Sequence, residues 1–200
     1  MPTVNPFEIV KKFEDEVAKY TGSPYAVAVN SCTSALFLCC KYINVQEVVI
    51  PNKTYVSVPC SIIHAGGKVK FEEREWSGIY QLKPYPLYDA AKRFTRGMYI
   101  DESFMCLSFH MKKILPIGTG GIILTSSHEA YKWFRLARFD GRHEVSLSED
   151  VFSMVGWNMY MTPEQAARGL WLMSYLSDHN EDMPYEDYQN LSKYDIYKGK

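Results

Sequence analysis

The sequence predicts an α/β fold in three layers, with a mostly parallel β-sheet between two layers of helices. Short apolar runs typical of buried strands alternate along the chain with segments whose apolar residues recur at helical spacing. Polar turns follow several of these runs, as expected where a strand gives way to a helix. The chain has 200 residues, of which 46% are hydrophobic and 22% are charged, so it can bury the core of one domain.

The first predicted element is a helix that begins close to the N-terminus. Asn5 suits the N-cap, Pro6 the first helical position and Glu8 the third, and apolar residues then recur at helical spacing as far as Tyr20. The alternation continues with predicted strands over residues 25–29, 47–50 and 68–71 and with predicted helices over residues 34–42 and 54–65.

The second half of the chain is predicted to add four short strands, two helices and a polar tail. The strands cover residues 87–88, 98–100, 104–108 and 122–125, and the helices cover residues 129–138 and 162–176. From Asp178 onward the apolar periodicity is lost, and Asp, Glu, Asn, Tyr and Lys dominate. We therefore expect residues 1–177 to form a compact domain and residues 178–200 to form a loosely ordered tail.

Charge and hydropathy exclude two broad classes of protein. The chain has 22 Lys and Arg residues against 23 Asp and Glu residues, so no overall positive field attracts nucleic acid or anionic lipid. The longest apolar run, Ala35 to Cys40, is far shorter than the roughly 18 residues that a membrane span needs. Residues 1–16 have no apolar core of a signal peptide. The expected location is the cytoplasm.

The cysteines indicate reduced thiols. There are five of them, which is an odd number, and they lie inside apolar segments: Cys32, Cys39, Cys40, Cys60 and Cys106. Neighbouring side chains on a helix diverge by about 100°, and no Cys or His partner stands at metal-ligand spacing from the adjacent pair. Neither a disulfide framework nor a metal site is expected.

Two polar groups directly follow predicted strands, where ligands bind in α/β sheets. Ser31, Cys32 and Thr33 would open a helix, whose first N–H groups and hydroxyls suit a phosphate, although Ser and Thr are also common helix caps. Asp89 ends the strand at residues 87–88 and precedes two alanines. Taken alone, it is either a helix cap or a site residue.

A third group lies between residues 108 and 121. A strand ends at Ser108, two lysines (Lys112 and Lys113) follow among apolar residues, and a Gly-rich turn starts the next strand. A lysine held against apolar neighbours suits Schiff-base chemistry, because desolvation favours the neutral amine. As a bare pattern, such a pair is also common on solvated loops.

Five segments taken in order resemble the DegT/DnrJ/EryC1/StrS family of sugar aminotransferases, which have fold type I and depend on pyridoxal 5'-phosphate. Residues 88–91 (YDAA) are similar to the family's Glu-Asp-Ala-Ala motif, and residues 108–121 (SFHMKKILPIGTGG) to its Ser-Phe-His-x-x-Lys-x-Leu-x-x-Gly-Glu-Gly-Gly motif. The other similar segments are residues 13–36, 48–71 and 156–167. The resemblance implies the large domain of that fold, with pyridoxal 5'-phosphate as the cofactor.

The resemblance also assigns roles around the cofactor ring. Lys113 would form the Schiff base, with Lys112 as the alternative, and Asp89 would face the pyridine nitrogen, where a carboxylate keeps the ring an electron sink. Tyr55 would stack on the ring. Lys92 would approach the phenolic oxygen, where the family usually has Gln or His.

Other residues are implied to hold the phosphate. Cys32 and Thr33, together with Ser108, match positions that contact the phosphate of the same chain's cofactor. Asn158 matches an Asn that reaches the phosphate of the neighbouring subunit's cofactor. The resemblance therefore implies a homodimer with shared active sites.

The sequence departs from the family pattern in residues and in length. Cys32 replaces a Gly, Thr119 an acidic residue and Tyr160 an Arg. A strand-helix unit expected between Phe71 and Tyr88 is missing, as is most of the small C-terminal domain that closes over the substrate. These departures affect substrate binding more than cofactor binding.

The function implied is transfer of an amino group, from a donor such as glutamate, to a keto sugar linked to a nucleotide. Two alternatives remain open. The chain could bind the cofactor but perform other amine chemistry, such as half-transamination of a small amino acid, or it could be a non-catalytic relative that acts as an interaction protein. Asp89 and Lys113 argue against the last, because a scaffold has no physical need for both. Residues 140–150 or a dimer partner could replace part of the missing substrate wall.

Overall fold

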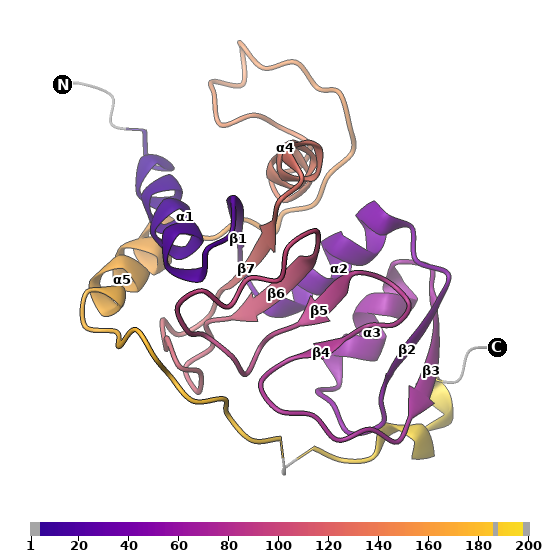
Figure 1. The fold of residues 1–200 in the computed structure, drawn as a ribbon. Helices are drawn as coiled ribbons and strands as arrows, with labels where there is room; N and C mark the ends of the chain where they lie inside the picture. Colours follow the sequence, from indigo (N-terminus) through magenta and orange to yellow (C-terminus); the bar gives the residue numbers. More distant parts are fainter. Residues whose placement is uncertain (1–4, 186–187, 198–200) are drawn as a thin grey trace.

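The computed structural model describes residues 5–185 and 188–197. Its main sheet has five strands in the order β1-β7-β6-β5-β4, and a separate ladder joins β2 to β3 (Figure 1). The strands are β1 (Tyr25–Val29), β2 (Glu47–Pro51), β3 (Lys68–Glu72), β4 (Tyr80–Gln81), β5 (Leu87–Asp89), β6 (Phe104–Ser108) and β7 (Gly121–Thr125). Backbone hydrogen bonds between Val49 and Lys83 link the ladder to the chain just after β4.

The described ranges contain five α-helices, of which four cover the main sheet and one packs beside the β2–β3 ladder. They are α1 (Glu8–Thr21), α2 (Cys32–Ile43), α3 (Ser57–His64), α4 (His128–Ala137) and α5 (Pro163–Met173). Val27 and Val29 of β1 pack into the core under α2, α3 and α4, whereas Ala26 and Ala28 pack into the core under α1 and α5. Helices α1 and α5 lie side by side (Figure 1). No helix in the described ranges is long and apolar enough to cross a membrane.

The predicted α/β class is confirmed, but the strand directions are mixed. In the main sheet only β5 and β6 run parallel, while the β1–β7, β6–β7 and β4–β5 pairs run antiparallel. The five residues between β4 and β5 are too few for a crossover, so these two strands run antiparallel. The longer connection over residues 90–103 allows β5 and β6 to run parallel, although no helix is described there.

Several predicted element boundaries differ from the structure, and one predicted strand is not formed by the described residues. Helix α3 begins at Ser57 rather than Thr54, which places Pro59 in the first turn, where its missing N–H removes no helical hydrogen bond. Residues 98–100 do not form a strand. Instead, the Tyr99 N–H donates to the carbonyl of Thr21, which ends α1.

The C-terminal segment runs from α5 across the molecule to β3 (Figure 1). The Arg96 guanidinium pairs with Asp178, and the side chain of Asn180 donates to the carbonyl of Phe94. Two short 3-10 helices, η1 (Leu191–Lys193) and η2 (Asp195–Tyr197), bury Leu191 and Tyr197 against the domain. The polar composition predicts loose packing here, but these contacts attach the described part of the segment along its length.

Candidate active site

A cavity of about 500 Å³ lies at the carboxyl ends of β5 and β6, beside the N-terminus of α2. Seven of the eight residues that the sequence predicts for the site line it: Cys32, Thr33, Tyr55, Asp89, Lys92, Ser108 and Lys113. Strand ends at one edge of an α/β sheet meet in space, which explains how residues 80 positions apart share one cavity.

The N-terminus of α2 is held at the cavity by its cap and by a close approach of β7. Ser31 is the N-cap, and its hydroxyl accepts a hydrogen bond from the Ser34 N–H at 3.1 Å. A Cβ atom on Gly121, the first residue of β7, would lie 2.5 Å from the Cys32 nitrogen, so only glycine permits this approach. The first N–H groups of a helix have no intrahelical partner and favour an anion.

Asp89 is the buried acid of the cavity, with only 5% of its surface exposed. One carboxylate oxygen, Oδ1, accepts the Ala91 N–H at 2.9 Å. The other, Oδ2, accepts the Tyr80 hydroxyl at 2.9 Å. Two donors from separate segments therefore fix the plane of the carboxylate.

Burial raises the pKa of Asp89, although the Ala91 N–H, the Tyr80 hydroxyl and the cations Lys113 and Lys92 all act to lower it. The net direction shows that the surrounding donors and cations do not fully compensate the buried negative charge. A cationic group bound in the cavity against Asp89 would supply the missing compensation.

Lys113 lies on the loop that follows β6 and is half-buried. Its backbone N–H donates to the His110 carbonyl at 2.9 Å, which fixes the turn that presents the side chain. Its charge acts to lower the pKa of both Asp89 and Cys32, and all three residues line the same cavity. Lys112 also lines the cavity but is exposed.

Hydroxyl groups gather at the α2 side of the cavity. The Thr33 hydroxyl donates to the Ser57 hydroxyl at 2.9 Å, and Ser108 lies across from them at the end of β6. The thiol of Cys32 lies 3.6 Å from the Cys106 carbonyl. Burial and the nearby Asp89 raise the pKa of Cys32 well above its ordinary value, so this side chain is a neutral thiol.

Tyr55 and Lys92 form the outer part of the cavity, next to the C-terminal segment. Tyr55 is 56% exposed, and its ring centroid lies 6.2 Å from that of Tyr188. The Lys92 ammonium donates to the Pro184 carbonyl and lies 4.7 Å from the centre of the Tyr188 ring. The Lys92 amine is thus directed to the C-terminal segment.

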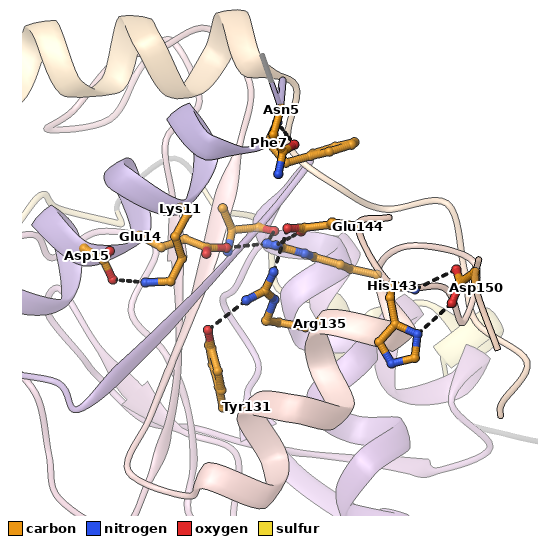
Figure 2. Close-up of polar contacts among 12 residues, drawn as sticks. Asn5, Phe7, Lys11, Glu14, Asp15, Tyr131, Arg135, His143, Glu144 and Asp150 are labelled. Carbon is orange, nitrogen blue, oxygen red and sulfur yellow. Dashed lines mark hydrogen bonds and ion pairs between the residues drawn. The ribbon is translucent and has the colours of Figure 1, made fainter. Parts of the chain in front are cut away.

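Asn158, the eighth predicted residue, lies outside the cavity. Its side-chain amide donates to Asp140 at 3.1 Å, and its backbone pairs with Phe139. Nearby, the buried Arg138 donates to Glu14 and to Glu144, which ties the 140–158 segment to α1. Figure 2 shows this ion-pair network, with Arg135 also bound to Glu144 and His143 to Asp150.

Several lining residues carry no recognisable motif. Trp76 comes from the segment between β3 and β5, and its ring meets that of Tyr80, which lies behind the lining, edge to face at 4.7 Å. Met183 and Tyr188 come from the C-terminal segment. Among the lining residues that the sequence analysis did not name, Ser57 could have been predicted, because it is a hydroxyl residue two positions after Tyr55.

The sequence profile of the DegT/DnrJ/EryC1/StrS aminotransferase family matches residues 4–100 and 96–184. The chain belongs to this family. It is 42% identical to the spore coat polysaccharide biosynthesis protein SpsC of Bacillus subtilis, across 84% of this chain and 57% of that protein. It is also 25% identical to GDP-perosamine synthase of Caulobacter vibrioides, across 85% of this chain and 57% of that enzyme. The chain thus spans a little over half the length of these curated relatives.

The fold is that of solved members of this group. The structure resembles the PLP form of a putative sugar aminotransferase from Streptococcus pneumoniae with a TM-score of 0.69 and 18% identity. The match covers 83% of this chain and 59% of that one. The predicted large-domain fold of the pyridoxal phosphate aminotransferases is confirmed, apart from its mixed strand directions.

Proposed function

We propose that this chain is an aminotransferase that uses pyridoxal 5'-phosphate to move an amino group from a donor such as glutamate to a nucleotide-linked keto sugar. The observation that carries the proposal is that a buried acid, Asp89, and a half-buried lysine, Lys113, line one cavity at the strand ends. Membership of the family and the names of the relatives support the same chemistry.

The donor set of the cavity fits pyridoxal phosphate. The undercompensated carboxylate of Asp89 suits a protonated ring nitrogen, because the two charges would cancel in a buried place. The first turn of α2, with the hydroxyls of Thr33, Ser57 and Ser108, suits a phosphate at the other end. When bound, the cofactor supplies an aldehyde that takes up the amino group and a ring that withdraws electrons.

Each residue of the cavity would then have a distinct role that depends on its position. Asp89 would hold a proton on the ring nitrogen, and the exposed ring of Tyr55 would lie against the cofactor. The Lys113 Nζ would hold the cofactor and would accept and return a proton at the Cα of the donor. Lys112, which is exposed on the same loop, is left free to contact acidic groups of the substrates.

We further propose that the active sites are shared across a homodimer. Asn158 is exposed and lies outside its own chain's cavity, so its amide is available to a neighbouring subunit. The same segment exposes large apolar side chains, with Phe152 at 63% and Val155 at 90% exposure, which a partner would cover.

The experiment that tests the function is an absorbance titration of the purified chain with pyridoxal phosphate, followed by addition of glutamate. We expect a visible absorbance band on binding and its loss when glutamate transfers its amine. Lys113→Ala should abolish the amine transfer, whereas Lys112→Ala should retain it. No spectral change with the unmodified chain would refute the proposal.

A second candidate, amine chemistry on a small amino acid, is favoured by one observation. Met183 and Tyr188 of the C-terminal segment line a cavity of about 500 Å³, and the cofactor itself would occupy part of it. Nucleotide-linked keto sugars and small keto acids should therefore be offered separately to the aminated cofactor form. Return of the absorbance band with keto acids alone would favour this candidate.

A further inference from the structure

Tyr80 lies beside the acid of the proposed site although no family motif includes it. It opens β4, the short strand that lies between β3 and β5 in the chain. In the antiparallel β4–β5 pair, Tyr80 stands directly opposite Asp89. Cross-strand partners project to the same face of a sheet, so this register brings the tyrosine side chain to the carboxylate. The Tyr80 side chain is buried, with 4% exposure.

The direction of the hydrogen bonds at Tyr80 follows from charge and burial. Burial, reinforced by Asp89, raises the pKa of Tyr80 well above its ordinary value, so the phenol keeps its proton. An ionised carboxylate only accepts, so the Tyr80 O–H donates to Asp89 Oδ2 at 2.9 Å. The buried Thr54 hydroxyl, which also contacts the Tyr80 oxygen, must then be the donor of that second bond.

The hydrogen-bond chain from Thr54 through Tyr80 to Asp89 leaves some acceptor sites of the carboxylate unused. Each carboxylate oxygen can accept two hydrogen bonds, and the Ala91 N–H and the Tyr80 hydroxyl take one each. Since Asp89 also lines the cavity, its remaining acceptor sites are available to a ligand there. Bonds from donors on two sides prevent the carboxylate from rotating.

We propose that Tyr80 is a positioning residue that orients Asp89 toward the ring nitrogen of the cofactor and keeps it a charged acceptor, with Thr54 fixing the direction of the tyrosine O–H. This inference rests on the proposed function. It assigns a role to β4, which no family motif includes. Tyr80 acts through Asp89 and does not contact the substrate.

The test compares Tyr80→Phe with Tyr99→Phe. The first change removes only the hydroxyl and keeps the ring that packs against Trp76. The second removes a matched hydroxyl, which donates to the Ser103 carbonyl at 3.0 Å and lies outside the cavity. Carbon-13 NMR of the apo chain follows the protonation of Asp89, whose signal is assigned by its loss in Asp89→Asn.

In Tyr80→Phe the pKa of Asp89 should rise by about one pH unit, as expected for loss of a hydrogen bond to a charged group. The acid limb of glutamate half-transamination should move upward in pH by a similar amount. Thr54→Val should move both in the same direction by less, and Tyr99→Phe should move neither. If Tyr80→Phe does not fold, Thr54→Val tests the same effect on the titration of Asp89.

The two proposals fail in different ways. If the unmodified chain binds no pyridoxal phosphate, the proposed function fails, whatever the apo titration shows. If the unmodified chain binds the cofactor and reacts, but Asp89 and the acid limb titrate identically in Tyr80→Phe, the role of Tyr80 is refuted. An identical upward shift in Tyr99→Phe would refute it as well, because the effect would then be general to the fold.

Discussion

The inner wall of the cavity and the segment over residues 140–158 each contain groups in an unfavourable environment, a buried charge in the first and exposed apolar side chains in the second. At the inner wall, Asp89 is a buried acid whose charge its neighbours compensate only in part. In the other segment, large apolar side chains remain in water, with exposures from 49% to 90%: Val145, Leu147, Val151, Phe152 and Val155. A buried charge is stabilised by a nearby opposite charge, whereas exposed apolar surface is stabilised by burial against another apolar surface.

The two regions therefore indicate two different kinds of binding partner, a cationic ligand for the cavity and a protein surface for the apolar segment. The ring of the proposed cofactor would compensate the charge in the first region. A second subunit, as proposed above, would cover the five exposed apolar side chains that spread over eleven residues in the second. The predictions below separate the two regions, beginning with the largest expected effect.

Asp89→Asn should slow glutamate half-transamination on the order of 100-fold, because a neutral amide no longer stabilises the charge on the ring nitrogen. Cofactor binding should persist, since the phosphate contacts are separate. Stopped-flow absorbance measures the rate. A rate within twofold of the unmodified chain would remove Asp89 from the mechanism.

The same variant should stabilise the apo chain at neutral pH. Since burial raises the pKa of Asp89 above its unfolded value, the ionised form costs stability at pH 7, and the cost disappears as pH falls below about 4. The asparagine amide can donate to Tyr80, whose O–H then turns to Thr54. We expect the apo Tm to rise by about 2–4 °C at pH 7 and to match the parent near pH 4. A lower Tm at pH 7 would contradict the uncompensated charge.

Val155→Asp should weaken self-association by at least about tenfold, because a charge would enter an apolar interface. Val155 is 90% exposed, so the fold of the single chain should tolerate the change. Ile196→Asp is the matched control on a surface far along the chain, at 77% exposure. Analytical ultracentrifugation gives both dissociation constants. An unmodified chain that is monomeric at micromolar concentration would refute the shared site.

Arg93→Ala should weaken pyridoxal phosphate binding by about threefold, the smallest of these effects. Arg93 binds Asp182 through two nitrogens, at 2.8 Å and 2.5 Å, and so fixes the position of Met183 at the cavity. Arg96→Ala, which removes a more exposed pair with Asp178, is the control and should leave affinity unchanged. Fluorescence titration measures both. Equal affinities would show that the C-terminal segment does not shape the cavity.

The inner wall was predictable from sequence because its chemistry lies at strand ends. Asp89, Ser108 and the turn at Cys32 lie at the carboxyl ends of short apolar strands. These three strands point the same way, because β5 is parallel to β6 while β1 and β6 both run antiparallel to β7. Their carboxyl ends therefore share one edge, although the sheet is mixed rather than mostly parallel.

The contributions of Tyr80 and of the C-terminal segment could not be predicted. A two-residue strand has no periodicity, and only the register with β5 places Tyr80 opposite Asp89. The polar segment after Asp178 attaches through separate contacts, such as the ion pair of Asp182 with Arg93 and the burial of Leu191 and Tyr197, rather than through a periodic apolar face. Such contacts depend on the finished fold and leave no pattern along the chain.

The most direct measurement is reduction of the chain with borohydride in the presence of pyridoxal phosphate, followed by peptide mapping. Lys113 is half-buried and lines the same cavity as Asp89, whereas Lys112 is exposed and Lys92 is directed to Pro184. We predict one stoichiometric pyridoxyl label, on Lys113. A label on Lys112 or Lys92 alone, or none at any lysine, would contradict the account.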